Sequence, residues 1–309
     1  MEFLNVSRLK KAFGQHVAVD DLSFSVYKGG IFGFLGPNGA GKTTTMSMIC
    51  GLLAPDSGSV ELDGKTLEPT QPETRRMLGV VPQDLALYPD LTGLENLRFF
   101  GQLFGLDGSR LNERLDVVLQ QIGLVESAGN AVSTYSGGMK RRLNFGAAIL
   151  HQPSLLILDE PTVGVDPQSR SHLLDCVRSL SNAGTTVLFA SHYMEEVQSI
   201  CQRVAIIDHG KLLTLGTVRE LLGHVDSAVS VVVDGVIDAA SLPISNVELA
   251  SADQECSTFS LPVNDNFDAL LTEFLSHIHQ LGRRVRSIES REANLEQLFL
   301  QLTGHSLRD

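Results

Sequence analysis

The stretch GPNGAGKT, Gly36 to Thr43, decides the fold of this chain. It matches the phosphate-binding pattern G-x-x-x-x-G-K-[ST], and it follows an apolar run, Ile31 to Leu35, that predicts a buried strand. The residues after it, TTTMSMICGLL, predict a helix that ends before Pro55. A strand, a glycine-rich loop and a helix in this order are typical of a nucleotide-binding α/β domain. The alternative, a glycine turn followed by a surface lysine, would not require a strand before it and a helix after it.

The chemistry of this loop is that of a phosphate cradle. Glycines let backbone N–H groups wrap around phosphates, Lys42 adds a positive charge for the β- and γ-phosphates, and the Thr43 hydroxyl can ligate Mg²⁺. The sequence therefore predicts a nucleotide with Mg²⁺ as the ligand. The candidate binding residues are Gly36, Pro37, Asn38, Gly39, Ala40, Gly41, Lys42, Thr43 and Thr44.

Two acidic residues close a second apolar run, LLILDE, Leu155 to Glu160. Ligands of parallel sheets gather at the carboxyl ends of the strands, which is where these side chains would lie. Asp159 is a candidate for the Mg²⁺ shell, and Glu160 for the base that activates water against the γ-phosphate. Strands also end in charged residues for ordinary reasons, and Pro161 could simply stop this one. The glycine-rich loop favours the catalytic interpretation.

Three further residues fit such a site, but spacing alone leaves their roles open. His192 follows the apolar run TTVLFAS and can hydrogen-bond a γ-phosphate or simply begin a helix. Gln83, in VVPQD, can reach Mg²⁺ or the attacking water, or occupy a turn. Phe13 can stack on an adenine ring or pack in a core.

Composition excludes several classes of protein. The chain has 309 residues, and 24 basic minus 36 acidic residues gives a net charge of −12, so we expect no nucleic acid partner. The cysteines lack a metal-binding spacing, which indicates reduced thiols in a cytosolic protein and no structural metal. No apolar run approaches the roughly 18 residues of a membrane span, so we expect the chain to cross no membrane by itself. The cysteines are Cys50, Cys176, Cys201 and Cys256.

The pattern of residues 1–222 predicts one nucleotide-binding domain. Residues 1–28 alternate apolar and polar positions, which predicts antiparallel strands. From about residue 84 to residue 150 the periodicity is helical, with a capping-box signature at Thr92 and Glu95. The helix pattern SRSHLLDCVRSLSNAG lies between two buried-strand runs, so we expect a mainly parallel sheet with crossover helices.

Residues 223–309 predict a small α+β domain of their own. A valine-rich run, AVSVVVDGVI, and a later run, RRVRSIE, predict strands, and NLEQLFLQLTG predicts a last helix. A helix is expected from Asn264 to Leu281 because apolar residues recur there on one face. Those residues are Phe267, Leu270, Leu271, Phe274, Ile278 and Leu281.

Taken together and in this order, GPNGAGKTT, Gln83, YSGGMKRR, LLILDEP, GVDP and His192 resemble the ATP-binding subunits of ATP-binding cassette (ABC) transporters. The resemblance covers nearly all of residues 1–220. It implies the P-loop NTPase fold of an ABC cassette, with a mainly parallel sheet, an antiparallel β subdomain and an inserted helical subdomain. It also implies ATP as the nucleotide, Glu160, His192 and Gln83 as catalytic residues, and Mg²⁺ near Thr43, Gln83 and Asp159.

The segment YSGGM stands where this family has its LSGGQ signature. By resemblance, Ser136, Gly137 and Gly138 contact the γ-phosphate of ATP held by a second copy, so the chain would act as a homodimer. Asp166, in GVDP, would likewise face the other subunit. Tyr135 and Met139 replace the family's Leu and Gln, which leaves the Ser-Gly-Gly core intact, and Phe13 stands where many members have a stacking tyrosine.

The stretches KAFGQHVAVDDLSFSV, LTGLENL and LEQLFLQLTG narrow the resemblance to ABC-2 type drug-resistance exporters, similar to daunorubicin-resistance ATP-binding proteins. This implies an ATPase subunit that lies peripherally on the cytoplasmic side of the cell membrane and powers export through a separate integral membrane permease. The alternative is a soluble ABC ATPase that transports nothing. One uninterrupted cassette, no long heptad run and an acidic charge argue against that alternative. Candidates for permease contact, or for core packing, are Tyr88, Phe99, Phe100 and Phe104.

Overall fold

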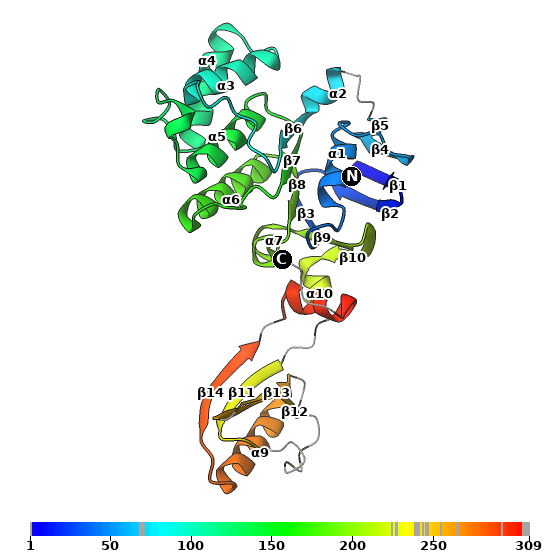
Figure 1. Ribbon diagram of the computed structural model, residues 1–309, viewed down its shortest axis with the longest axis vertical. Coiled ribbons are helices and arrows are strands. Elements are labelled where there is room, and N and C mark those ends of the chain that lie inside the picture. The colour runs from blue at the N-terminus through cyan, green and yellow to red at the C-terminus, as the bar shows by residue number, and fades with distance from the viewer. Residues whose placement is uncertain are drawn as a thin grey trace. The chain divides into compact units, whose positions relative to one another are not determined.

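The computed structural model divides the chain into two units, Met1–Val218 and Arg219–Gly304, and each unit has its own sheet and core (Figure 1). The structure describes residues 2–67, 72–223, 225, 228–237, 242, 244, 247–253, 255–263, 266–291 and 293–304. Among these residues, no helix combines the length and the apolar character that a membrane crossing requires.

A six-stranded sheet of order β10-β9-β3-β8-β7-β6 forms the centre of the first unit. All neighbouring strands are parallel except β10, which runs antiparallel to β9. Every residue of β3, β7 and β8 is buried, which explains their continuous apolar sequences and confirms the predicted mainly parallel sheet. The strands are β3 (Ile31–Leu35), β6 (Leu78–Val81), β7 (Leu155–Asp159), β8 (Thr186–Ser191), β9 (Arg203–Asp208) and β10 (Lys211–Thr217).

An antiparallel sheet of order β2-β1-β4-β5 packs against the central sheet, as the alternation of residues 1–28 predicts. The two sheets share one core, in which the ring of Phe24 lies 5.5 Å from Phe32 and 5.2 Å from Phe34, measured between centroids. This packing fixes the β1–β2 hairpin beside the glycine-rich loop. The strands are β1 (Glu2–Phe13), β2 (His16–Tyr27), β4 (Ser57–Leu62) and β5 (Lys65–Thr66).

Helix α1 (Lys42–Ile49) follows the glycine-rich loop but is shorter than the sequence pattern predicts. The prediction that it runs through Leu53 is wrong. Gly51 adopts a left-handed φ of +70°, and the Leu52 N–H donates to the Ser47 carbonyl at 2.9 Å, so the chain turns away from the helix axis. The turn leaves Leu52 78% exposed.

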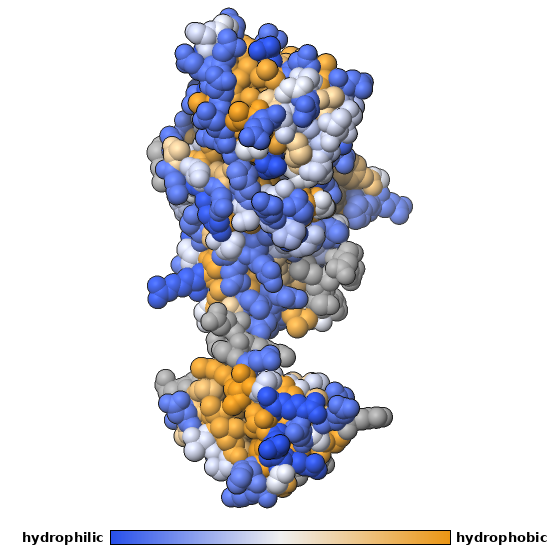
Figure 2. Space-filling model, turned by 90° about the vertical axis from the view of Figure 1, so that its left-hand side faces the viewer, coloured by the Kyte–Doolittle hydropathy of each residue, from blue (hydrophilic) through white to orange (hydrophobic). Residues whose placement is uncertain are grey.

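A group of helices is inserted between β6 and β7 and lies to one side of the central sheet in Figure 1. The predicted capping box is present: Thr92 Oγ1 accepts from the Glu95 N–H at 3.1 Å, and the Thr92 N–H donates to Glu95 Oε2 at 2.8 Å. Hydrophobic residues reach the surface of this region among charged ones (Figure 2). The helices are α3 (Gly93–Leu103), α4 (Gly108–Gln121) and α5 (Gly137–Ile149); α2 (Pro72–Met77) precedes β6.

The central sheet continues into α6 (Pro167–Asn182) after β7 and α7 (Met194–Ile200) after β8. Pro167 stands at the first position of α6, and Asp166 caps that helix by accepting from the Ser169 N–H at 2.9 Å. A short helix, α8 (Val218–Leu222), follows β10.

The second unit is an α+β fold with a four-stranded antiparallel sheet of order β12-β13-β11-β14. Helix α9 (Phe267–Gln280) buries Phe274 and Ile278 against the valines of β11, whereas Leu281 lies beyond the helix end and is exposed, so its placement on the apolar face was wrong. Asn264, the predicted start, lies outside the described residues. The other elements are β11 (Ala228–Asp234), β12 (Glu248–Ala252), β13 (Cys256–Pro262), β14 (Val285–Arg291) and α10 (Leu295–Thr303).

Candidate nucleotide-binding site

The candidate site lies at the carboxyl edge of the central sheet, where four adjacent parallel strands end. Strand β3 leads into Gly36, β8 into His192 and β7 into Glu160. Strand β6 leads into Pro82, which Gln83 follows. Residues that are far apart in the sequence therefore meet at one edge because the strands are parallel and in register.

The glycine-rich loop is shaped by close approaches that exclude side chains. Gly39 and Gly41 have φ values of +80° and +99°, in the region that favours glycine. A Cβ on Gly41 would lie 2.4 Å from the Ala18 carbonyl oxygen, and one on Gly36 would lie 2.5 Å from the Ile207 carbonyl oxygen. The loop is thus pressed between β2 and the end of β9, and Asn38 and Gly39 are left exposed at its tip.

Lys42, Glu160 and His192 form one cluster, in which Lys42 and Glu160 are buried and His192 is partly buried. Lys42 Nζ lies 3.0 Å from Glu160 Oε1 and donates to the Gly36 carbonyl at 2.8 Å, and His192 Nδ1 lies 3.2 Å from the same carboxylate oxygen. Burial acts to raise the pKa of Glu160, but its contacts with Lys42 and His192 outweigh burial and hold that pKa below its usual value. Glu160 is therefore ionised at neutral pH.

The backbone of Glu160 is also unusual. Its φ is +49°, a left-handed value that is uncommon for a residue other than glycine, and its N–H donates to the Ala190 carbonyl of β8 at 3.0 Å. Such a conformation costs on the order of 1–3 kcal/mol and is typical of functional sites. The turn directs this carboxylate toward Lys42.

Asp159, the last residue of β7, is buried beside Thr43. Burial raises the pKa of its carboxyl, and Glu160 adds to that shift, while a hydrogen bond from Thr43 and the charge of Lys42 oppose it. Its Oδ1 has no hydrogen-bond partner among the described residues. A buried carboxylate oxygen without a partner next to a hydroxyl is a donor set that suits a hard divalent cation.

The comparisons with known proteins agree with this site. Residues 19–163 match the protein family described as ABC transporter. The linearmycin resistance ATP-binding protein LnrL of Bacillus subtilis (strain 168) is 42% identical over 311 residues, which cover 99% of this chain and 100% of the relative. This chain belongs to the ABC transporter ATP-binding proteins.

Other relatives of this ABC protein place it among exporter ATPases of the ABC-2 type. A Nod factor export ATP-binding protein I of Cupriavidus metallidurans is 38% identical, with 99% of both chains covered. The daunorubicin/doxorubicin resistance ATP-binding protein DrrA of Streptomyces peucetius is 36% identical, over 99% of this chain and 94% of the relative. A solved ATP binding subunit of an ABC transporter has a TM-score of 0.65 at 29% identity, covering 71% of this chain and 91% of that chain.

Membership of this family makes the chain an ATP-binding ATPase coupled to transport. Subunits of this kind work with membrane permeases, and relatives named for resistance and export favour transport over the alternative of a soluble ATPase. The ABC cassette fold expected from the sequence is confirmed.

The signature segment YSGGM presents Ser136 and Gly137 to solvent. Ser136 caps α5 by accepting from the Met139 N–H at 3.2 Å, and Ser136 and Gly137 are exposed. Gly138 is buried, and a Cβ on it would lie 2.2 Å from Ser169 Oγ. Tyr135 replaces the family's leucine. Its side chain is buried and its hydroxyl donates to the Ser127 carbonyl at 2.6 Å, so the tyrosine anchors the signature segment within the chain.

Three other predicted residues are accessible at the surface of the cassette. Gln83 is exposed, and only its backbone carbonyl forms a described bond. Phe13 is 51% exposed at the β1–β2 hairpin, so the alternative that it packs in the core is wrong. Lys11 Nζ lies 5.8 Å from the centre of its ring. Asp166, at the start of α6, is likewise exposed.

Sequence reasoning missed a buried acidic residue next to this site. Glu196 of α7 accepts from Thr162 Oγ1 at 2.7 Å, and its other oxygen lies 3.4 Å from Arg170 Nε. Burial raises the pKa of Glu196, and the contacts with Thr162 and Arg170 oppose that shift. The bonds tie the segment after Glu160 to α6 and α7. The acidic pair in YMEEV is a signal in the sequence, but its spacing does not show which glutamate faces inward.

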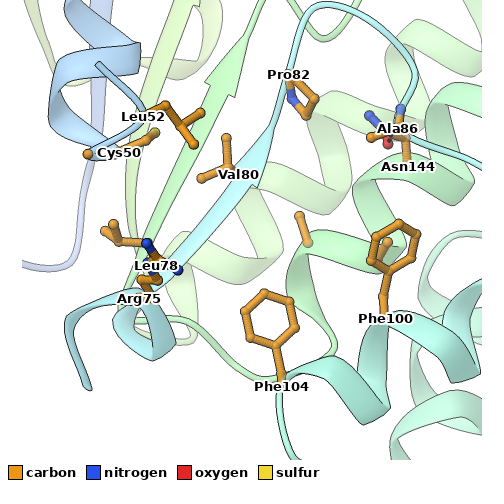
Figure 3. Close-up of a pocket in the computed structure, with 13 residues that line it drawn as sticks. Cys50, Leu52, Arg75, Leu78, Val80, Pro82, Ala86, Phe100, Phe104 and Asn144 are labelled. Atoms are coloured by element: carbon orange, nitrogen blue, oxygen red, sulfur yellow. Dashed lines mark hydrogen bonds between the residues drawn. The ribbon is translucent and has the colours of Figure 1, made fainter. Parts of the chain in front are cut away.

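An apolar groove of about 370 Å³ lies between the segment after α1, β6 and helices α3 and α5 (Figure 3). The rings of Phe100 and Phe104 point into it, and Leu52 faces them from the far wall. Tyr88 and Phe99 lie on the surface, with ring centroids 5.0 Å apart. The groove is lined by Cys50, Gly51, Leu52, Arg75, Leu78, Val80, Pro82, Ala86, Phe100, Phe104, Asn144, Ala147 and Ala148.

Proposed function

We propose that this chain powers export by binding and hydrolysing two Mg·ATP between two copies of itself, while attached to a separate integral membrane permease on the cytoplasmic face of the membrane. The observation that carries the proposal is the meeting of Lys42, Asp159, Glu160 and His192 at one edge of the parallel sheet. A cation, two carboxylates and an imidazole converging beside a phosphate loop suit phosphoryl transfer to water.

The acid–base chemistry is assigned to Glu160. A γ-phosphate competes with its carboxylate for Lys42 and His192, which both contact that carboxylate. Once Lys42 and His192 turn to the phosphate, the ionised carboxylate is free to orient a water and accept its proton. Lys42 then neutralises charge on the transferring phosphoryl group, and His192 hydrogen-bonds that group.

Magnesium fits the group formed by Thr43, Asp159 and Gln83. The Thr43 hydroxyl already contacts Asp159, one Asp159 oxygen has no partner, and no described residue bonds the Gln83 side chain. When bound, Mg²⁺ neutralises charge on the β- and γ-phosphates. We assign the rest of the phosphate cradle to the backbone of Gly36, Pro37, Asn38, Gly39, Ala40, Gly41 and Thr44. Phe13 is assigned to stack on the adenine.

The second copy supplies the signature residues. Ser136 and Gly137 are exposed at the N-terminus of a 13-residue helix, where free N–H groups and the helix dipole favour an anion. Together with Gly138, they are assigned to the γ-phosphate held by the other copy, and the exposed Asp166 is assigned to the facing surface. Each site is then completed only when two chains meet.

The permease is assigned to the groove of Figure 3, because a mainly apolar wall open to solvent suits a helix with an apolar face. We assign residues 1–222 to the ATP-binding domain, with a helical subdomain at about 84–150, and residues 223–309 to an accessory domain. Relatives named for linearmycin, daunorubicin and Nod factor support export of a small molecule.

The substitution Glu160→Gln tests this assignment, because it keeps the size of the side chain and removes the base. We expect ATP binding to persist and turnover to fall by about 10²-fold or more. The slow variant should form stable dimers with ATP and Mg²⁺, measured by size-exclusion chromatography with light scattering, and chelation of Mg²⁺ should disperse them. Hydrolysis at the wild-type rate would show that Glu160 is not the base.

A further inference from the structure

Helix α5 holds the segment after β6 at two points. Arg141 Nη1 donates to the Gln83 carbonyl at 2.5 Å, and the Ala86 N–H donates to Asn144 Oδ1 at 3.3 Å. Arg141 and Asn144 are three residues apart, so they lie on the same face of the helix. One face of α5 therefore fixes both ends of the short stretch 83–86.

Little else in the described structure holds this stretch. Strand β6 ends at Val81, and the next bonded position is Tyr88, whose N–H donates to Asn96 Oδ1 at 2.8 Å. Gln83 and Ala86 are both exposed, in neither helix nor strand. The location of Gln83 at the carboxyl edge of the sheet consequently depends on its bond to Arg141.

Arg141 is suited to this task by its charge and its surroundings. Burial lowers the pKa of its guanidinium, whereas Asp84 and Glu160 act to raise it, and an arginine stays charged under either influence. A charged donor makes a stronger bond to a carbonyl than a neutral one does. The two acidic residues come from the segment after β6 and from the turn after β7, so the charge of the guanidinium acts on both parts of the site.

We propose that Arg141 is a positioning residue that holds Gln83 at the catalytic edge and links its location to that of the signature helix. The inference rests on the proposed function, in which the Gln83 side chain serves Mg²⁺ or the attacking water. Ser136 caps the same helix, which lines the groove with Asn144, Ala147 and Ala148. A permease seated in the groove would thus act on Gln83 and on the signature segment through one helix.

A double-mutant cycle tests the proposal on the purified full chain, with ATPase kcat and KM as readouts. Arg141→Met removes the donor but keeps an unbranched side chain. We expect kcat to fall about tenfold with KM for ATP unchanged, because the phosphate cradle is intact while a reacting-site residue is displaced. Arg141→Lys keeps a charged donor and should restore part of the rate.

The decisive comparison is made in the Gln83→Ala background, where the amide that Arg141 positions is absent. There Arg141→Met should cost no further activity, so the two losses should not multiply. If the double variant loses the product of both factors, or if Arg141→Met alone keeps the wild-type kcat, Arg141 does not act through Gln83 and the proposal is overturned.

Arg142→Met provides a matched control from the same helix. Arg142 Nη1 donates to the carbonyls of Ile122 and Gly123, at 2.8 Å and 3.2 Å, so its loss also removes an α5 guanidinium without touching Gln83. Hydrogen exchange of residues 83–87 should accelerate in Arg141→Met and not in Arg142→Met; equal exchange in both would overturn the proposal. If Glu160→Gln and Gln83→Ala both hydrolyse ATP normally, the proposed function itself fails. This result distinguishes failure of the proposed function from failure of the proposal for Arg141 alone.

Discussion

Lys42 Nζ lies 3.0 Å from Oε1 of Glu160, and both side chains are almost completely buried. The phosphate-binding cation and the predicted base are thus partners within the protein itself. Removing one member of a buried ion pair leaves the other charge without compensation, which is costly in a region of low polarity. The pair therefore contributes to folding as well as to the proposed chemistry.

Replacing Lys42 with Met should lower the free energy of unfolding by up to about 3 kcal/mol at neutral pH, because Glu160 keeps only His192. The folded pKa of Glu160 is lowered, so the pair's contribution is present above the unfolded pKa of about 4.3 and is lost as pH falls through the folded value. Urea titrations of both proteins should show the difference shrinking from pH 7 toward pH 3. A difference independent of pH would contradict an ionised Glu160.

Gly137→Ala should lower ATPase activity about tenfold or more without changing Tm. A Cβ on Gly137 would lie 3.7 Å from the Gly164 carbonyl oxygen, an ordinary contact, so the chain tolerates it. In the proposed dimer, the added methyl would instead project from an exposed segment toward the nucleotide of the other copy. Activity and thermal melting, measured on the same sample, test this expectation, and a lowered Tm would mean that the substitution acts within its own chain.

Mixing the Gly137→Ala and Lys42→Met chains should restore part of the activity that each lacks alone. In the mixed dimer, one site combines the intact Lys42 of one chain with the intact signature of the other. The measurement is the ATPase rate as the ratio of the two proteins is varied, with a maximum expected near equal amounts. A rate that never exceeds the sum of the separate rates would contradict a composite site.

Leu52→Glu should release the chain from its permease and leave ATP hydrolysis in solution unchanged. Leu52 lines the groove and is 78% exposed, so a charge there is tolerated in the free protein but is costly in an apolar contact. Leu103→Glu is the control, because Leu103 is 66% exposed and does not line the groove. Flotation of native membranes should recover the wild-type and Leu103→Glu proteins with the membranes but not Leu52→Glu. Equal recovery of all three proteins would show that the permease docks at another surface.

Sequence reasoning predicted where site residues lie only where the order and direction of the strands determine it. Gly36, Glu160 and His192 each follow a run that the sequence predicts as a buried strand, and parallel pairing brings such positions to one edge. Strand β6, which precedes Gln83, was not predicted. The sequence could not predict that Glu160 bonds to Lys42 rather than to solvent, since that depends on a left-handed turn at Glu160 itself. The role of Arg141 was hidden for a similar reason, because its partner is a backbone carbonyl.

Element ends and short strands were less predictable than the motifs. Helix α1 ends at Ile49 although its apolar pattern continues, because a left-handed Gly51 and an amide bond to Ser47 override the pattern. Strands β12 and β13 were not predicted, since ELASA and CSTFSLP carry few residues that favour a strand over a loop. Ser257 of β13 is buried by its neighbours rather than by its own hydrophobicity.

The central claim is that this ATPase works on a membrane permease. The most direct measurement is to tag the chain in its native cell, solubilise the membranes gently, and identify and quantify what is recovered with wild type and with Leu52→Glu. We predict a multi-spanning membrane protein at about one-to-one stoichiometry with wild type, and its loss with Leu52→Glu. Recovery only from the soluble fraction, with ribosomes, chromosomal proteins or no partner, would contradict the claim and favour a soluble ABC ATPase.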